Sequence, residues 1–359
     1  MPKQRLLEKI QAHGIQGNVI TWIHQWLSGR KQRVVINVSH SDWSDVKSGV
    51  PQGSILGPLA FIIFINDIDC CAEMIDVILK FADDTKAGHQ ISADRDRQSL
   101  QTCLDNLVEW ADKWQMQFNI SKCKVMHIGR GNPMHTYYMS GIALQEVSTE
   151  KDIGVLLDSS LKPSKQCAEA ARRANAILGE ISRAFHFRDR FVYVNLYKKY
   201  VRCHMEFSVS AWCPWSVADK EALERVQRRA VAMVSGLTGT TYKERLEEIG
   251  LMSLETRRIR FDMIETFKML NSFSDVDYTN WFNLIPPTAR QTRSNTGYMN
   301  LERSFARTQV RENFFSVRVP PIWNSLPDDI KKSRTIQSFK KQFDIWAKLN
   351  GHLLNNNQH

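Results

Sequence analysis

Two adjacent carboxylates, Asp83 and Asp84, are the residues of this 359-residue chain whose types and spacing best suit chemistry. They directly follow an apolar, strand-like run at 77–81, and residues 85–89 resemble the start of a returning strand. This order predicts a hairpin with both carboxylates at its tip. Two neighbouring negative charges are costly to bury, so they should face solvent or share a cation, and an all-oxygen site suits Mg²⁺. An ordinary acidic turn is the alternative, because aspartate favours turns.

A glycine- and proline-punctuated loop lies upstream of the carboxylates, at 49–58. Its centre, here called the PQGS loop, consists of Pro51, Gln52, Gly53 and Ser54. An apolar helix is expected at 59–68, directly after Pro58, because proline is favoured at the first helical position. Such a loop alone is weak evidence of function. Together with an acidic pair at this separation, it favours a functional interpretation of both elements.

Both segments resemble the reverse transcriptases of non-LTR (LINE-type) retrotransposons, with the greatest similarity to the CR1-like lineage. The resemblance is carried by SGVPQGSILGPLAFIIFIND at 48–67 and FADDTK at 81–86. It extends to WADKWQMQFNISKCKVMHIG, LERVQRRAVAMVSGL and FFSVRVPPIWNSLP further along the chain. It implies an RNA-directed DNA polymerase, a nucleotidyltransferase with a right-hand fold and two metal ions. Its partners would be an RNA template, a DNA primer and dNTPs.

The resemblance also implies roles for individual residues. Asp83 and Asp84 would be catalytic ligands of Mg²⁺ or Mn²⁺, and the PQGS loop would contact the template and the nucleotide. Lys122 matches the lysine associated with the leaving pyrophosphate, where it would neutralise developing negative charge and donate a proton. The alternative for Lys122 is a solvated lysine at a strand edge.

One departure from the family pattern affects the expected activity. The family places a further metal-binding aspartate, and most of the fingers, on a segment that would precede Met1. We therefore expect an N-terminally truncated domain with an incomplete catalytic site, weak or inactive alone. Asp67 and Asp69 are the nearest other carboxylates, and we interpret them as the polar end of the apolar helix, where the chain leaves the core. The alternatives are a non-catalytic nucleic-acid-binding remnant and a retrotransposon fragment without a selected role.

The positive charge of the chain lies in its second part. Residues 1–158 contain 16 Lys and Arg against 18 Asp and Glu, whereas residues 159–359 contain 32 against 20. This asymmetry favours contacts between the second part and a polyanion such as an RNA–DNA duplex. A merely solvated basic surface is the alternative. The candidate backbone contacts are Arg172, Arg173, Lys198, Lys199, Arg202, Arg225, Arg228 and Arg229.

Composition narrows the class of protein. The seven cysteines include no C-x-x-C pair and no zinc-finger spacing, so we expect neither zinc nor a disulfide framework. No apolar run is long enough to span a bilayer, and the N-terminal residues do not form a signal peptide. The expected setting is intracellular, nuclear or cytoplasmic, without a membrane partner.

The predicted fold class is α+β, in three parts. Residues 1–158 would form a partial palm, residues 159–271 a basic helical thumb, and residues 272–359 a C-terminal region with a linker and a terminal helix. Helices are expected at 163–185, 188–204, 217–235, 242–249, 254–270 and 336–349. The other expected elements are a helix capped by Asp94, a hairpin at 137–144, a buried strand at 152–158 and an extended segment at 305–319.

Overall fold

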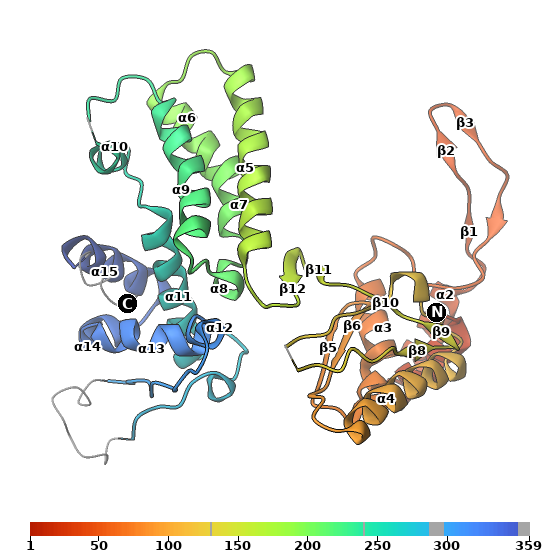
Figure 1. Cartoon of the computed structure of the whole chain (residues 1–359). Coiled ribbons are helices and arrows are strands. Elements are labelled where there is room, and N and C mark those ends of the chain that lie inside the picture. The colour runs from red at the N-terminus through yellow and green to blue at the C-terminus, as the bar shows by residue number, and fades with distance from the viewer. Residues whose placement is uncertain (130, 240, 287–297, 351–359) are drawn as a thin grey trace. The chain divides into compact units, whose positions relative to one another are not determined.

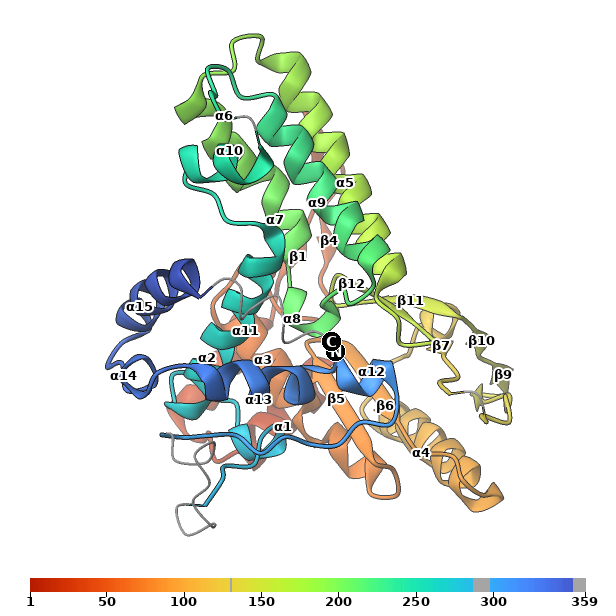
Figure 2. The ribbon, with the colours of Figure 1, turned by 60° about the vertical axis from the view of Figure 1, so that its left-hand side comes forward.

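The computed structural model describes residues 1–129, 131–239, 241–286 and 298–350. The chain divides into two units, Met1–Ser148 and Thr149–His359, called unit 1 and unit 2 (Figures 1 and 2). Unit 1 contains as many basic as acidic residues, so the whole net charge of +10 lies in unit 2. Helices and short strands occur together, in agreement with an α+β class. No described helix is long and apolar enough to cross a membrane.

Unit 1 combines four helices with short two-stranded ladders among its described residues. Its helices are α1 (Lys3–Ala12), α2 (Asn18–Leu27), α3 (Leu56–Ile65) and α4 (Asp94–Lys113), with 3-10 helices η1 (Asn66–Ala72) and η2 (Ile120–Lys122). Its strands are β1 (Lys31–Gln32), β2 (Val35–Ile36), β3 (Ser39–His40), β4 (Ser44–Asp45), β5 (Val77–Phe81), β6 (Asp84–Gly88), β7 (Lys124–Val125), β8 (Tyr138–Met139), β9 (Ile142–Ala143) and β10 (Gln145–Glu146). Each strand pairs with one partner only, so no continuous sheet forms in the described part of unit 1.

Two helix starts in unit 1 differ from the sequence-based expectation. Helix α3 begins at Leu56, so Pro58 lies inside its first turn, where its missing N–H costs no helical hydrogen bond. Asp94 is the first residue of α4 rather than its cap. The carboxylate of Asp96 accepts hydrogen bonds from the backbone N–H groups of Ser92 and Ala93, which ties down the start of α4.

The main core of unit 1 surrounds a lysine. Helices α1, α2, α3 and α4 and η1 contribute to one apolar cluster that includes Leu6, Leu27 and Phe64. Lys9 of α1 is only 5% exposed, and its Nζ donates to the carbonyl oxygen of Phe64 at 2.5 Å and to Asp67 Oδ1 at 2.5 Å. The same ammonium lies over three aromatic rings, those of Phe64, Trp110 and Trp114, at 4.7, 4.5 and 3.9 Å.

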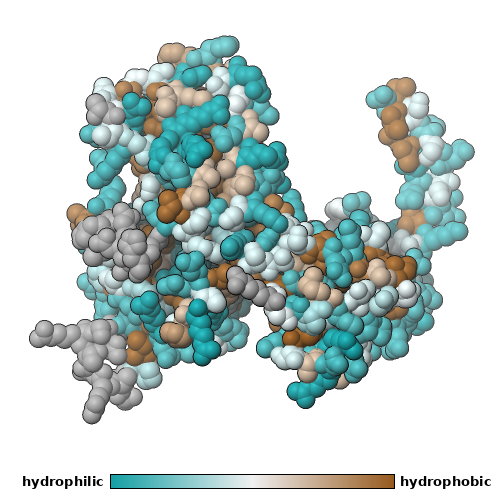
Figure 3. Space-filling view, in the orientation of Figure 1, coloured by the Kyte–Doolittle hydropathy of each residue, from teal (hydrophilic) through white to brown (hydrophobic). Residues whose placement is uncertain are grey.

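Helix α4 contacts apolar residues on two sides. One side joins the main core, and the other packs against a smaller cluster of Tyr137, Met139 and Leu144 from the β8–β9 region. The predicted hairpin at 137–144 is confirmed, with the turn at Ser140 and Gly141. The β1–β4 and β2–β3 ladders form one long hairpin whose end carries exposed valines and isoleucine, visible as brown atoms in Figure 3.

Unit 2 is mostly helical. Its helices are α5 (Ser164–Ala184), α6 (Arg190–Leu196), α7 (Arg202–Glu206), α8 (Val209–Trp212), α9 (Val217–Ala232), α10 (Tyr242–Glu248), α11 (Leu254–Leu270), α12 (Gln309–Glu312), α13 (Phe315–Ser325), α14 (Asp328–Lys331) and α15 (Ile336–Leu349). A π-helix, η3 (Tyr197–Val201), joins α6 to α7, and a 3-10 helix, η4 (Tyr278–Asn280), follows α11. Its strands are β11 (Thr149–Asp152) and β12 (Val155–Asp158). The helices predicted from periodicity are confirmed.

Two predictions for unit 2 are wrong. The expected strand at 152–158 is a hairpin, because Ile153 and Gly154 adopt φ of 43° and 87° and reverse the chain between β11 and β12. The expected extended segment at 305–319 includes α12 and the start of α13. In α13, Phe315, Val319, Ile322 and Trp323 are buried at helical spacing, although Pro320 and Pro321 within the helix argue against it.

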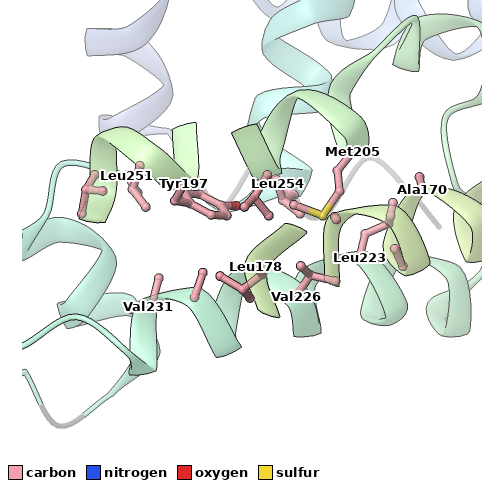
Figure 4. Close-up of a cluster of buried hydrophobic side chains, with 14 of the residues drawn as sticks. Ala170, Leu178, Tyr197, Met205, Leu223, Val226, Val231, Leu251 and Leu254 are labelled. Atoms are coloured by element: carbon pink, nitrogen blue, oxygen red, sulfur yellow. The ribbon is translucent and has the colours of Figure 1, made fainter. Parts of the chain in front are cut away.

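Helices α5 and α9 run parallel and side by side (Figures 1 and 2). Ser164 Oγ donates to Asp219 Oδ2 at 2.8 Å near the start of both helices, and Arg229 Nη1 donates to Asn175 Oδ1 at 3.4 Å further along. Their apolar faces meet around Leu178, Leu223 and Val226, and η3 covers them with Tyr197 (Figure 4). The Tyr197 hydroxyl donates to Gln227 Oε1 at 2.6 Å within this core.

Helix α11 connects the two apolar clusters of unit 2. Leu254 belongs to the α5–α9 core, whereas Ile259 to Leu270 pack with α13 and α15. The predicted C-terminal region therefore shares a core with the predicted thumb. Arg318 of α13 pairs with Asp262 of α11 through two hydrogen bonds of 2.9 Å, and both residues are largely buried. Burial alone would lower the pKa of Arg318, but the Asp262 carboxylate raises it, so the guanidinium stays charged.

We predict that replacing Lys9 with Met destabilises unit 1 by about 2 kcal/mol, because it leaves a buried carbonyl and a carboxylate without their donor. Lys113→Met is the matched control, since Lys113 is exposed and lies 5.6 Å from the same Trp114 ring. Urea unfolding followed by tryptophan fluorescence compares the variants. Equal unfolding midpoints for Lys9→Met and Lys113→Met would contradict the prediction.

A second prediction concerns pH. Lys331 is 1% exposed and donates to Asn300 Oδ1 at 2.7 Å, and burial lowers its pKa to about 8. In the unfolded chain Lys331 keeps its proton up to the higher pH that is usual for lysine, so between about pH 8 and 10 the unfolded state binds more protons than the folded state. The contribution of Lys331 to the free energy of unfolding should therefore rise over this range, by about 1 kcal/mol per pH unit. Denaturation of the wild type and Lys331→Met across this range measures the difference. Parallel curves for the two proteins would overturn the prediction.

Candidate functional site

The predicted hairpin with the two carboxylates is confirmed. Strands β5 and β6 pair from Val77 opposite Gly88 to Phe81 opposite Asp84. Ala82 and Asp83 form the two-residue turn, and Ala82 adopts a positive φ of 54°. Asp83 therefore lies in the turn, whereas Asp84 begins β6. Both side chains are exposed, and neither forms a hydrogen bond or ion pair with another described residue.

The two faces of this hairpin differ in exposure. Ile78 and Ala87 pack against the main core of unit 1. The opposite face carries Leu79 and Phe81, which are 56% and 60% exposed. Because directly paired residues share a face, Asp84 lies on the exposed face beside Phe81. The face beside Asp84 thus carries Leu79 and Phe81 together with Lys86, which is paired with Leu79.

A salt bridge fixes the hairpin to the end of the preceding helix. Lys80 Nζ donates to the carbonyl oxygen of Asn66 at 3.0 Å and to Asp69 Oδ2 at 2.7 Å. Asp67 accepts hydrogen bonds from Lys9 and, at 3.1 Å, from the indole Nε1 of Trp110. Lysines therefore bind both carboxylates of η1, Asp67 and Asp69, which agrees with their interpretation as the polar end of the helix.

The PQGS loop is held from within, and its glutamine is exposed. Ser54 Oγ donates to the carbonyl oxygen of Pro51 at 2.7 Å and accepts from the backbone N–H of Gly57 at 3.0 Å. A Cβ at Gly57 would lie 2.9 Å from Ser54 Oγ and 3.1 Å from the Pro51 oxygen, so this close approach requires glycine. Gln52 is exposed at the outer end of the loop, where its amide can contact a ligand.

Lys122 lies in a different layer of unit 1. It ends η2, is exposed, and precedes β7, which pairs with β10 in parallel. Its neighbours Ile120, Cys123 and Val125 pack on the second side of α4, away from the core that holds the carboxylate hairpin. No contact joins Lys122 to Asp83 or Asp84 among the described residues.

The acidic pair provides oxygen ligands for one hydrated divalent cation, which usually takes one or two protein carboxylates. A two-ion site needs carboxylates that bridge both ions. The described residues contain no group of three or more His, Cys, Asp or Glu side chains placed to hold a metal. Asp83 and Asp84 thus fit a single, weakly held Mg²⁺ or Mn²⁺, and within the described residues they do not complete a two-ion centre.

The basic residues of unit 2 fall into two groups. Five of the eight candidates are paired or partly buried. Glu169 holds both Arg172 and Arg173, at 2.7 and 2.5 Å, and these guanidiniums lower the pKa of Glu169 to about 2. Arg228 forms a bidentate pair with Glu221, Arg202 pairs with Glu206 at 3.4 Å, and Lys198 is partly buried.

The remaining three candidates, Lys199, Arg225 and Arg229, are exposed and form no ion pair within the described residues. Arg225 and Arg229 are one helical turn apart on α9, and the contact of Arg229 with Asn175 places them along the seam between α5 and α9. Arg172 and Asn175 lie on the α5 side of that seam. This arrangement offers several donors to an extended anion.

Sequence inspection missed the lysines that position the site. Lys9 and Asp67 are 58 residues apart in the chain, and Lys80 and Asp69 are 11 apart, so no local pattern joins them. The one available signal was the position of Lys9 within the apolar repeat of α1, beside Leu6 and Ile10. A charged residue at that spacing indicates a buried partner.

The chain is similar in sequence to known polymerases. Residues 1–168 match the family described as reverse transcriptase (RNA-dependent DNA polymerase). The probable RNA-directed DNA polymerase from transposon X-element of Drosophila melanogaster is 23% identical over 223 residues, which cover 60% of this chain and 24% of the relative. The RNA-directed DNA polymerase from mobile element jockey of Drosophila funebris is 25% identical over 241 residues, covering 63% and 26%.

A third relative, the probable RNA-directed DNA polymerase from transposon BS of Drosophila melanogaster, is 23% identical over 222 residues, covering 57% of this chain and 24% of the relative. The chain thus spans about a quarter of the length of these relatives. No solved structure matches it. Residues 1–168 match the reverse transcriptase family, and the chain is a homologue of the reverse transcriptases of non-LTR retrotransposons.

Proposed function

We propose that the chain is part of an RNA-directed DNA polymerase in which unit 1 serves as palm and unit 2 as thumb. The observation that carries this proposal is the pair of exposed carboxylates at the turn between β5 and β6, which have no partner among the described residues. Two adjacent carboxylates repel each other, and a shared cation relieves this repulsion. The pair is therefore suited to bind a cation. The family match over residues 1–168 supplies the reaction class.

Within unit 1, the proposed roles follow from exposure and anchoring. Asp83 and Asp84 would hold Mg²⁺, which when bound stabilises the charge on phosphoryl oxygens. Gln52 would contact the template or the incoming nucleotide, because the internal bonds of Ser54 keep the PQGS loop in shape while leaving that amide exposed. Lys122 would neutralise charge on the leaving pyrophosphate, as the family resemblance implies.

Within unit 2, the α5–α9 seam would hold the sugar-phosphate backbone of an RNA–DNA duplex. Arginine and lysine side chains that contact phosphates position a nucleic acid without reading its sequence. Arg225 and Arg229 are the strongest candidates, because neither forms an ion pair within the described residues. Arg172, Arg173 and Arg228 would first have to leave their glutamate partners.

We predict that Mg²⁺ raises the thermal stability of the chain through Asp83 and Asp84. For a single site, a Mg²⁺ concentration ten times the Kd should stabilise it by about 1.4 kcal/mol. The double variant Asp83→Asn/Asp84→Asn should lose this effect and, without Mg²⁺, be at least as stable as the wild type because the repulsion is removed. Thermal unfolding at increasing Mg²⁺ measures both quantities.

The matched control is Asp42→Asn/Asp45→Asn, which removes two exposed carboxylates from another hairpin of unit 1. This variant should keep the Mg²⁺ effect. A Mg²⁺ effect that persists in Asp83→Asn/Asp84→Asn would place the cation elsewhere.

We also predict sequence-tolerant, salt-dependent binding of an RNA–DNA duplex through the α5–α9 seam. Replacing Arg225 and Arg229 with Gln should reduce the slope of log affinity against log salt by about two, one for each lost phosphate contact. Arg228→Gln should change the slope less, because Glu221 already occupies that guanidinium. Fluorescence anisotropy at several salt concentrations provides the measurement.

Further outcomes separate binding from catalysis. Asp83→Asn/Asp84→Asn should leave the salt slope unchanged, since those residues lie in unit 1. Template-dependent dNTP incorporation that disappears in this variant would establish polymerisation, whereas duplex binding without incorporation favours a nucleic-acid-binding protein. A slope unaffected by Arg225 and Arg229 would exclude the proposed seam.

A further inference from the structure

Helix α15 carries a second basic surface, separate from the α5–α9 seam. Lys340, Lys341 and Lys348 of α15 border an open hollow of about 350 Å³, together with Arg260 of α11. Helix α15 packs on α11, and in both ribbon views α11 and α9 lie between it and α5 (Figures 1 and 2). We call these three lysines and the adjoining hollow the α15 face.

The charge of the α15 face is not neutralised internally. The one acidic residue of α15, Asp344, is engaged by Arg260 through bonds of 2.5 and 3.0 Å, in which the guanidinium donates from Nε and Nη2. None of the three lysines forms an ion pair within the described residues. The segments outside the described residues contain no Asp or Glu, so all acidic residues of the chain are accounted for.

Other basic helices of unit 2 behave differently. Glu169 forms ion pairs with two arginines on α5, Glu221 pairs with Arg228 on α9, and Glu265 pairs with Lys268 on α11. A helix face that is merely solvated usually mixes charges of both signs in this way. The α15 face lacks that mixture, which indicates an anionic partner rather than a solvated surface.

The dimensions suit a strand of linked phosphates. Lys341 and Lys348 are seven residues apart, which corresponds to roughly 10 Å along the helix axis. One strand of a nucleic acid presents a phosphate about every 3.4 Å of its axis, so this length spans about three phosphates. Ile345 lies between the lysines in the same hollow and is 53% exposed, which offers an apolar contact to a sugar or a base.

We infer that the α15 face is a second nucleic-acid contact, which binds a phosphodiester backbone without sequence preference. The inference rests on the proposed function for the identity of the anion. A polymerase that extends a primer on an RNA template also meets template RNA that is not yet paired in the duplex. A surface on the other side of α11 from α5 would bind such a segment while the α5–α9 seam holds the duplex.

The test uses the whole chain and two labelled probes, a 20-nucleotide single-stranded RNA and an RNA–DNA duplex. Lys341→Gln/Lys348→Gln should reduce the salt slope for single-stranded RNA by about 1.4, which is about 0.7 for each lost phosphate contact. Lys162→Gln/Lys243→Gln is the matched control, because it removes two exposed, unpaired lysines of the same unit, and it should leave the slope unchanged. Asp344→Asn, which releases Arg260, should strengthen binding several-fold.

Combination with Arg225→Gln/Arg229→Gln separates the two proposals. If only the seam variant weakens binding, the α15 inference is wrong and the proposed function stands. If only the α15 variant does so, the proposed seam is wrong. Independent sites predict additive losses in the combined variant. Binding to vesicles with phosphatidylserine that disappears in Lys341→Gln/Lys348→Gln, without an effect on RNA, would overturn the inference in favour of a membrane surface.

Discussion

A buried ammonium group, that of Lys9, holds unit 1 together. Desolvation lowers the pKa of this lysine, but the carbonyl oxygen at the end of α3, the Asp67 carboxylate and three aromatic rings offset that cost. The interaction joins α1 to η1 and α4. From η1 a second lysine–aspartate pair, Lys80 with Asp69, extends to strand β5. Two acidic residues are thereby used for anchoring, and the two at the hairpin turn stay exposed.

Part of the charge of unit 2 is paired internally. Arg257 and Arg202 share Glu206, Arg318 and Asp262 pair in a buried site, and Glu169 holds two arginines. A net charge of +10 therefore overstates the surface available to a polyanion. The cations that form no ion pair in the described residues include Arg225 and Arg229 at the α5–α9 seam and three lysines of α15. Ion pairing, and not only the count of basic residues, therefore decides which cations remain available to a ligand.

The sequence predicted those parts of the fold whose cause is local. The hairpin at 77–88 follows from an apolar run and a turn, and α5, α9 and α11 follow from apolar spacing over many turns. The hairpin at 152–158 was missed because a left-handed turn at Ile153 and Gly154 interrupts an apolar run. Helix α13 was missed because Pro320 and Pro321 hide its period. In the site, the carboxylates were found from their neighbours, but the lysines that position them are distant in sequence and were not.

The two-sided packing of α4 should couple the two apolar clusters of unit 1 in folding. One side of the helix supports the core beneath the carboxylate hairpin, and the other supports the layer that carries Lys122. Leu104 and Phe118 contact both clusters. Local opening of α4 would therefore release the two regions together, and their amide protons would exchange with solvent at a shared rate. We therefore expect the acidic hairpin and the layer that carries Lys122 to lose their packing in the same opening event.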